Sequence, residues 1–253
     1  MEKNIEYKTH KIASYFKNNR ITWEQFYESE RKIISRLGLT RNSTILDIGC
    51  GCGGLSFALL DQFDVKNYTG VEINPFAAES AQTMNPKAHI LCGDIIKLSE
   101  KKLIEKQFDV VFSLSCIDWN VQFDEMLSAA WRFVKPEGGL VATFRLTIDE
   151  GCKDINRSYQ YINFDGILEG ECANYVVLNV NEILQQLCDL NPLKISAYGY
   201  WGAPSGTAVT PYETLCFSAF SFIKRKTNDN SPVSFDLDFP KGIYDILDEP
   251  FNG

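Results

Sequence analysis

The stretch ILDIGCGCGGLSFALL, residues 45–60, decides the fold. Its apolar start is typical of a buried strand, and its apolar end is typical of a helix that packs on a sheet. The glycines between them permit a tight turn in which the backbone approaches a ligand, and the amino terminus of the helix faces that turn. The stretch therefore predicts a strand, a ligand-binding turn and a helix, in that order.

The same alternation continues toward the carboxyl terminus. Strands are predicted at residues 43–49, 67–73, 88–94, 108–115, 140–146, 193–200 and 213–224. Helices are predicted at residues 54–63, 75–84, 99–105, 123–139 and 180–188, with Pro136 and Gly138 as stop signals for the fourth. Strands separated by helices of this length predict an α/β fold with a parallel sheet and right-handed crossovers.

We expect a single domain over residues 1–253 with three additions to the sheet. Residues 1–40 form an N-terminal helical segment, in which Thr22 and Gln25 would cap an amphipathic helix. Residues 147–178 are polar and irregular, and we expect them to be an insertion over the active-site end of the sheet. Residues 227–253 are an acidic tail whose apolar side chains predict that it packs down.

Charge and composition narrow the possible functions. The net charge of −8 disfavours a surface that holds nucleic-acid phosphates. No apolar run approaches the length of a membrane span, and the first residues lack the apolar core of a signal peptide, so we expect a cytoplasmic protein. The eight cysteines are not grouped at metal-ligand spacing, so we expect no metal site.

Two kinds of ligand compete for the glycine turn. Gly49, Gly51 and Gly54 spell the GxGxxG of dinucleotide-binding proteins, whereas Asp47 with Gly49, Gly51 and Gly53 spells an acidic-led DxGxGxG. The carboxylate of Asp47 would repel a pyrophosphate placed on this turn. S-adenosylmethionine has no phosphate and carries an ammonium and a sulfonium, so the acid favours it.

Five motifs in order resemble the class I S-adenosylmethionine-dependent methyltransferases. They are ILDIGCGCG, GVEINP, CGDI, FDVVFSLSCIDW and FVKPEGGLV, and the resemblance covers residues 20–146. It implies a Rossmann-like α/β fold with a mostly parallel sheet, an antiparallel last strand and here an inserted cap after the fifth strand. It also implies S-adenosyl-L-methionine as cofactor and S-adenosyl-L-homocysteine as product.

The resemblance implies a cofactor contact for each matching residue. The methionine end would be lined by Asp47, Gly49, Gly51, Gly53 and Ser115, the ribose bound by Glu72, and the adenine met by Ile73, Asp94 and Ile95. Asp94 is equally typical of a helix cap.

Asp118 is the candidate catalytic residue. It comes directly after the fourth strand, where an acceptor should approach, and a general base helps when the nucleophile is a hydroxyl. A helix cap is the alternative. The two histidines, His10 and His89, are expected away from the site. Trp119 would wall the pocket or belong to the core, and Arg145 would clamp a phosphate or carboxylate of the acceptor or form a surface salt bridge.

The insertion and a later strand supply the remaining acceptor candidates, Arg157, Tyr159, Tyr161 and Tyr200. Aromatic faces mixed with amides and hydroxyls suit a sugar, although they also occur in ordinary lids. The runs RSYQYINFDG, ANYVVLNVNEIL and YGYWGAPSGTAVTPYETLCFSAFSF are similar to methyltransferases of bacterial capsule and lipopolysaccharide clusters. This resemblance implies O-methylation of a surface-polysaccharide sugar such as a nucleotide-linked heptose.

Other functions remain open. The acceptor can be another small metabolite, and the chain can be a cofactor-binding partner subunit without activity. DNA amino-methyltransferases are disfavoured, because SLSCIDW stands where they carry an Asn or Asp, two prolines and an aromatic residue. The sequence leaves open the acceptor atom, the identity of the base and the oligomeric state.

Overall fold

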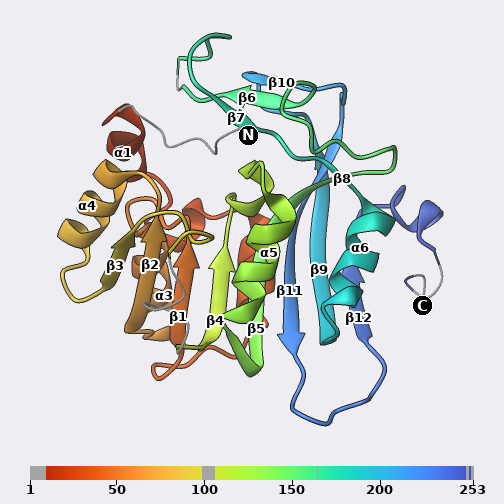
Figure 1. Ribbon diagram of the computed structural model, residues 1–253, viewed down its shortest axis with the longest axis horizontal. Helices are drawn as coiled ribbons and strands as arrows, with labels where there is room; N and C mark the ends of the chain where they lie inside the picture. Colours follow the sequence, from red (N-terminus) through yellow and green to blue (C-terminus); the bar gives the residue numbers. More distant parts are fainter. Residues whose placement is uncertain (1–9, 99–105, 164, 249–250, 252–253) are drawn as a thin grey trace.

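A computed structural model describes residues 10–98, 106–163, 165–248 and 251. Within these ranges nine strands form the main sheet, in the order β12-β9-β11-β5-β4-β1-β2-β3 with β8 beside β5 (Figure 1). The parallel part consists of β1 (Thr44–Ile48), β2 (Asn67–Glu72), β3 (His89–Cys92), β4 (Phe108–Ser113) and β5 (Val134–Thr147). β11 (Leu215–Lys224) runs antiparallel between β5 and β9 (Pro192–Gly202). The prediction of a Rossmann-like, mostly parallel sheet with an antiparallel last strand is confirmed.

Helices cover both faces of this sheet. Buried side chains of α2 (Glu28–Ser35), α3 (Gly54–Phe63) and α4 (Pro75–Met84) form one core with the strands. Buried side chains of α5 (Phe123–Arg132) and α6 (Val180–Asp189) form a larger core on the other face. Sandwiched in this way, β1 and β4 are buried along most of their length, whereas β3 at the edge of the sheet is partly exposed.

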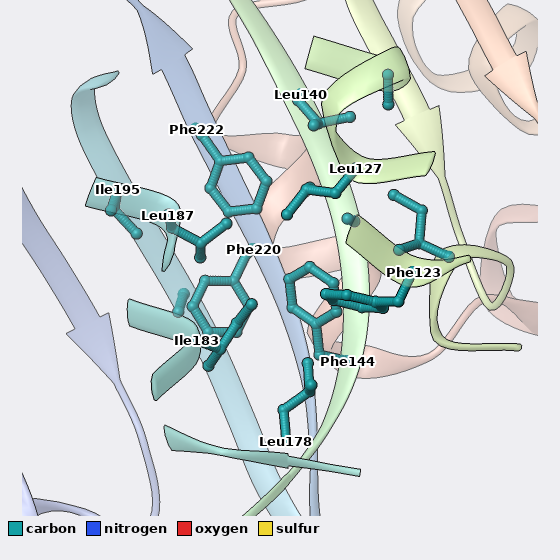
Figure 2. Close-up of a cluster of buried hydrophobic side chains, with 14 of the residues drawn as sticks. Phe123, Leu127, Leu140, Phe144, Leu178, Ile183, Leu187, Ile195, Phe220 and Phe222 are labelled. Carbon is teal, nitrogen blue, oxygen red and sulfur yellow. The ribbon is translucent and has the colours of Figure 1, made fainter. Parts of the chain in front are cut away.

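Aromatic packing fixes α5 and α6 on the larger core (Figure 2). The ring of Phe144 in β5 lies 5.9 Å from that of Phe123 in α5 and 5.4 Å from that of Phe220 in β11. Ile183 and Leu187 of α6 are completely or almost completely buried against the same cluster. Each such side chain contributes about 1.5–3 kcal/mol by burial, so this core stabilises the packing of α5 and α6 on the sheet.

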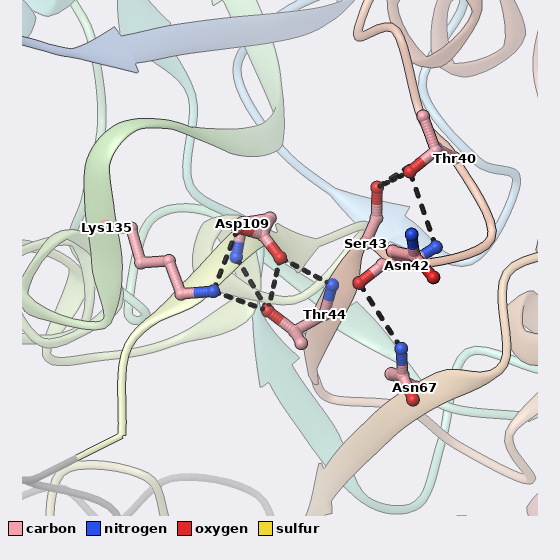
Figure 3. A network of polar contacts seen from close by, with 7 residues as sticks. All are labelled: Thr40, Asn42, Ser43, Thr44, Asn67, Asp109 and Lys135. Atoms are coloured by element: carbon pink, nitrogen blue, oxygen red, sulfur yellow. Dashed lines mark hydrogen bonds and ion pairs between the residues drawn. The ribbon is translucent and has the colours of Figure 1, made fainter.

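A polar network joins β1, β4 and β5 near their amino ends (Figure 3). Asp109 of β4 accepts hydrogen bonds from Thr44 N at 2.7 Å and Thr44 Oγ1 at 2.6 Å in β1, and pairs with Lys135 Nζ of β5 at 2.9 Å. Burial acts to raise the pKa of Asp109, but these donors outweigh it and lower the pKa. The network lies at the amino ends of the parallel strands, away from the glycine turn, so its role is structural.

The N-terminal segment differs from the single helix expected after Thr22. The structure has α1 (His10–Phe16), a 3-10 turn η1 (Trp23–Gln25) and then α2. Phe26 between η1 and α2 is extended, and its side chain is buried in the core. Gln25 Oε1 accepts from Thr22 N at 3.1 Å, so the expected pair caps η1 and not a long helix. Tertiary burial of Phe26 therefore breaks the helix that the pattern predicts.

The stop signals at Pro136 and Gly138 act differently from the prediction. The helix α5 already ends at Arg132, and both residues lie within β5, where the pairing with β4 shifts register. A Cβ on Gly138 would lie 2.7 Å from the carbonyl oxygen of Asp109, so the close approach of β4 requires glycine there. The helix predicted at 99–105 lies outside the described residues.

The insertion and the tail both form strands. β6 (Tyr159–Tyr161), β7 (Cys172–Asn174) and the distant β10 (Ala208–Val209) make a small antiparallel sheet at the edge where the parallel strands end (Figure 1). We call this sheet the cap. β8 (Leu178–Asn179) extends the main sheet beside β5, and the tail adds β12 (Ser234–Asp238) beside β9 and the 3-10 turn η3 (Tyr244–Ile246).

Candidate functional site

A pocket opens at the carboxyl ends of β1, β2, β3 and β4. Its lining includes eight of the nine predicted cofactor residues, namely Asp47, Gly49, Gly51, Glu72, Ile73, Asp94, Ile95 and Ser115. Trp119, predicted to meet the acceptor, lines it too. The topology brings these residues together because parallel strands end at the same edge of a sheet.

The glycine turn has the backbone shape that only glycine adopts readily. Gly49, Gly51 and Gly53 have φ angles of 75°, 55° and 78°, in the left-handed region. Gly49 N donates to Val71 O at 2.8 Å, which fixes the turn to β2. Gly53 does not line the pocket and instead precedes α3 as its N-cap. The helix α3 therefore begins directly behind the pocket floor.

Glu72 connects the ends of β1 and β2. Its Oε2 accepts from Gly51 N at 2.8 Å, and its Oε1 accepts from Asn74 N at 2.8 Å. Burial raises the pKa of this carboxyl, and backbone hydrogen bonds act against the rise. Each carboxylate oxygen retains a second lone pair for a hydroxyl donor in the pocket. Glu72 thus shapes the glycine turn and offers acceptors to a ribose.

Asp47 lies at the end of β1 with its carboxyl almost fully buried. Tyr68 Oη donates to its Oδ2 at 2.5 Å. Burial raises the pKa of Asp47 to about 7, against the opposing effects of Tyr68 and Arg20. The group therefore titrates near neutral pH and responds to a positive charge placed in the pocket.

Asp94 and Ser115 close two further sides of the pocket. Asp94 Oδ1 accepts from Ile96 N at 3.0 Å, so the residue caps the turn after β3 while it lines the pocket. Ser115 has a φ of 50°, and its N donates to Thr143 Oγ1 at 2.6 Å. This unusual backbone turns the chain after β4 across the pocket.

Asp118 and Arg145 form a buried ion pair behind Trp119. Arg145 Nη2 lies 2.7 Å from Asp118 Oδ2, and the guanidinium lies 4.4 Å from the ring of Trp119 and 3.8 Å from that of Tyr175. Burial raises the pKa of Asp118, and Arg145 opposes the rise. Neither residue lines the pocket. The alternative of a surface salt bridge for Arg145 is wrong, because both partners of the ion pair are buried. Base and acceptor clamp stay predictions for this pair.

The remaining acceptor candidates do not line this pocket. Tyr159 and Tyr161 lie in β6 of the cap with their rings in edge contact at 5.5 Å, and Arg157 is exposed beside them. Tyr200 of β9 packs on Phe217 at 6.1 Å. Their acceptor roles remain predictions.

Sequence reasoning missed the contribution of the N-terminal segment. Phe16, Asn19, Arg20 and Phe26 all line the pocket. No motif marks them, because their place depends on how residues 13–26 fold back over the glycine turn. Asn120 and Met126, after Trp119, were missed as well.

Two features of the described residues bear on other functions. No group of three or more His, Cys, Asp or Glu side chains in that part of the chain is placed to hold a metal ion. None of the helices in the described ranges is long and apolar enough to cross a membrane.

Comparison with solved structures identifies the fold. The chain superposes on phosphoethanolamine N-methyltransferase 2 of Haemonchus contortus in complex with S-adenosyl-L-methionine, with a TM-score of 0.57 and 15% identity over 85% of this chain and 56% of that one. A methyltransferase from Methanosarcina mazei gives a TM-score of 0.55 and 17% identity, over 79% of this chain and 99% of that one. The fold is that of the class I methyltransferases, whose cofactor is S-adenosyl-L-methionine.

Sequence comparison points in the same direction. Residues 46–140 match the model of a methyltransferase domain. It is similar to a malonyl-[acyl-carrier protein] O-methyltransferase of Priestia megaterium, 26% identical over 51% of this chain and 49% of that protein. Phosphoethanolamine N-methyltransferase 3 of Arabidopsis thaliana is 26% identical over 55% of this chain and 29% of that protein. The chain thus spans about half the length, or less, of these relatives.

Proposed function

We propose that the chain transfers the methyl group of S-adenosyl-L-methionine to a small-molecule acceptor. The observation that carries the proposal is the pocket itself, in which Asp47, Glu72 and Asp94 stand at the ends of three neighbouring strands. A dinucleotide would place its pyrophosphate beside the buried Asp47, which is unfavourable.

Different side chains of the pocket would bind different parts of the cofactor. Glu72 offers carboxylate oxygens to the ribose hydroxyls, and Asp94 and Ile95 stand where the adenine would lie. The bound cofactor supplies an activated methyl group on a sulfonium. The chain then has to hold the acceptor in line with that methyl group and exclude water, and Trp119 and Phe26 line the pocket with apolar surface for this purpose.

For the acceptor we propose a sugar that is methylated on a hydroxyl oxygen. Tyr159, Tyr161 and Tyr200, with the neighbouring amides of the cap, support it, because such side chains pack on sugar CH faces and bond to hydroxyls. The two relatives described above are a malonyl-[acyl-carrier protein] O-methyltransferase and a phosphoethanolamine N-methyltransferase, so an acceptor other than a sugar is the alternative.

The test follows the methyl label from S-adenosyl-L-methionine into separate pools of nucleotide sugars, other metabolites, protein and nucleic acid. Label in a nucleotide sugar is the expected result. Label in another metabolite pool would overturn the sugar and retain the methyltransferase. A protein that binds the cofactor and labels no pool would be a non-catalytic partner subunit.

Two variants locate the site in this assay. Glu72→Ala should abolish binding of S-adenosyl-L-homocysteine, because it removes the ribose acceptors and frees the glycine turn. Asp118→Asn should leave that binding intact and slow the transfer if Asp118 acts as the base. Glu79→Ala, on the exposed surface of α4, is the matched control and should behave as the wild type. Normal turnover of Asp118→Asn would remove Asp118 from the chemistry.

A further inference from the structure

Arg145 is buried between the wall of the pocket and the insertion. It stands near the carboxyl end of β5, and only 4% of its side chain is exposed. Its guanidinium lies 4.4 Å from the ring centre of Trp119, which lines the pocket, and 3.8 Å from that of Tyr175, which directly follows β7 of the cap. The two rings meet edge to face at 5.8 Å. One cation therefore holds a residue of the pocket and a residue of the insertion together.

Asp118 fixes the direction of this guanidinium. Arg145 Nε donates to Asp118 Oδ2 at 3.0 Å, and Arg145 Nη2 donates to the carbonyl oxygen of Asp118 at 2.7 Å. The same carbonyl oxygen accepts from Val176 N at 3.1 Å. The backbone beside Trp119 is thus joined both to β5 and to the chain that leaves the cap.

Ser158 joins this chain to the strands of the cap. Its carbonyl oxygen accepts from Tyr175 N at 3.0 Å, and its Oγ donates to Tyr175 O at 2.6 Å. Ser158 directly precedes β6 and is completely buried, and its Oγ lies 3.0 Å from Oγ1 of Thr210, which directly follows β10. A continuous series of contacts therefore runs from Trp119 through Arg145 and Tyr175 to β6 and β10.

Burial argues against direct contact between Arg145 and an acceptor. Its Nη1 has no hydrogen-bond partner among the described residues, but this atom is buried, and Arg145 does not line the pocket. We propose that Arg145 is a positioning residue, which fixes Trp119 and the cap in one arrangement so that an acceptor beneath the cap lies in line with the methyl group. The inference rests on the proposed function and replaces the acceptor clamp that the residue type suggests.

The kinetic experiment compares Arg145→Met and Arg145→Lys with wild type, on the acceptor that takes up the methyl label. Lysine retains the charge, but it has no planar group to place on two rings and no pair of nitrogens in a fixed fork. Both variants should therefore lose kcat by about a hundredfold, the effect of a small misplacement, while S-adenosyl-L-homocysteine binds nearly as in wild type. A clamp would instead raise the KM for the acceptor, and lysine would restore most of the loss.

Hydrogen exchange tests the same contacts without an acceptor. In Arg145→Met the amides of residues 117–120, β6 and β7 should exchange faster than in wild type, whereas those of α3 should be unchanged. Arg145→Met leaves the buried Asp118 without its partner, which is destabilising. Tyr175→Leu removes one ring and leaves the ion pair intact, so it keeps the test sound if Arg145→Met unfolds, and it should give the same pattern.

Lys224→Met is the matched control for the loss of a cation beside a tryptophan. Lys224 Nζ donates to Trp131 O at 3.0 Å and lies 5.1 Å from the centre of the Trp131 ring. It stands at the end of β11 that is remote from the cap. This variant should keep the exchange of the cap and the kcat of wild type.

The outcomes separate the inference from the proposed function. Wild type that labels no pool would overturn the proposed function, and the exchange rates would still decide whether Arg145 holds Trp119 and the cap together. Unchanged exchange of the cap in both Arg145→Met and Tyr175→Leu would overturn the inference. Recovery of turnover in Arg145→Lys, or a rise in the KM for the acceptor alone, would overturn it as well, because either result would identify Arg145 as a clamp.

Discussion

At the scale of single residues, Asp47 couples cofactor binding to pH. Burial raises its pKa to about 7, and a positive group in the pocket favours its ionised form. Below pH 7 binding must therefore release a proton. We expect the affinity for S-adenosyl-L-homocysteine to rise by up to about tenfold in total between pH 6 and pH 8 in wild type, and to be nearly flat over this range in Asp47→Asn.

The same residue predicts how stability of the unliganded protein changes with pH. Because the folded-state pKa lies above the ordinary aspartate value of 3.8, the contribution of Asp47 is fully present below pH 3.8 and is lost as the pH rises through about 7. Denaturant titrations at pH 6 and pH 8 should show wild type losing stability relative to Asp47→Asn. Parallel curves for the two proteins would contradict the raised pKa.

The sequence predicted which residues lie near the site better than it predicted which side chains contact one another there. Asp47, Glu72 and Asp94 stand near the carboxyl ends of predicted parallel strands, and such ends meet at one edge of a sheet. Asp118 and Arg145 were also expected near that edge. Their ion pair depends on the depth of each side chain below Trp119 and Tyr175, and a one-dimensional pattern carries no such information.

At the scale of elements, Gly54 is where residues 13–26, the N-terminal strap, pack on the start of α3. It is the third glycine of the GxGxxG pattern, and the structure gives it a reason unrelated to a dinucleotide, since the carbonyl oxygen of Arg20 occupies the space of a Cβ. Gly54→Ala should displace the strap and destabilise the fold by about 1–3 kcal/mol, the usual range for overpacking. It should also weaken binding of S-adenosyl-L-homocysteine.

Gly38 provides the contrast for this variant. Nothing lies within 4 Å of a Cβ built on it, although its φ of 64° makes a substitution locally strained. Gly38→Ala should therefore cost stability and leave the affinity for S-adenosyl-L-homocysteine unchanged, as measured by calorimetry on the folded protein. Equal loss of affinity in both variants would argue against a specific effect of the strap.

At the scale of the whole molecule, the tail completes the larger core. Phe239, Ile243 and Leu247 are buried among side chains of that core, and β12 pairs with β9. Ile243 is completely buried, so Ile243→Ala should lower the free energy of unfolding by about 2–5 kcal/mol. Ile148→Ala, at a side chain that is 43% exposed, is the control and should change it little. Equal effects in denaturant titrations would show that the tail is not part of the core.

The sequence by itself determined the succession of strands and helices along the chain as far as residue 146. It also determined the glycine turn and the acidic residues at the strand ends, because each of these depends on local pattern. Tertiary structure decided the break in the helix after Thr22, the pairing of the tail with β9 and the entry of Arg20 into the pocket. These features arise from contacts between segments far apart in the chain, and their energies depend on burial and close approach. Local periodicity therefore located the pocket floor, and only the folded chain supplied its N-terminal wall.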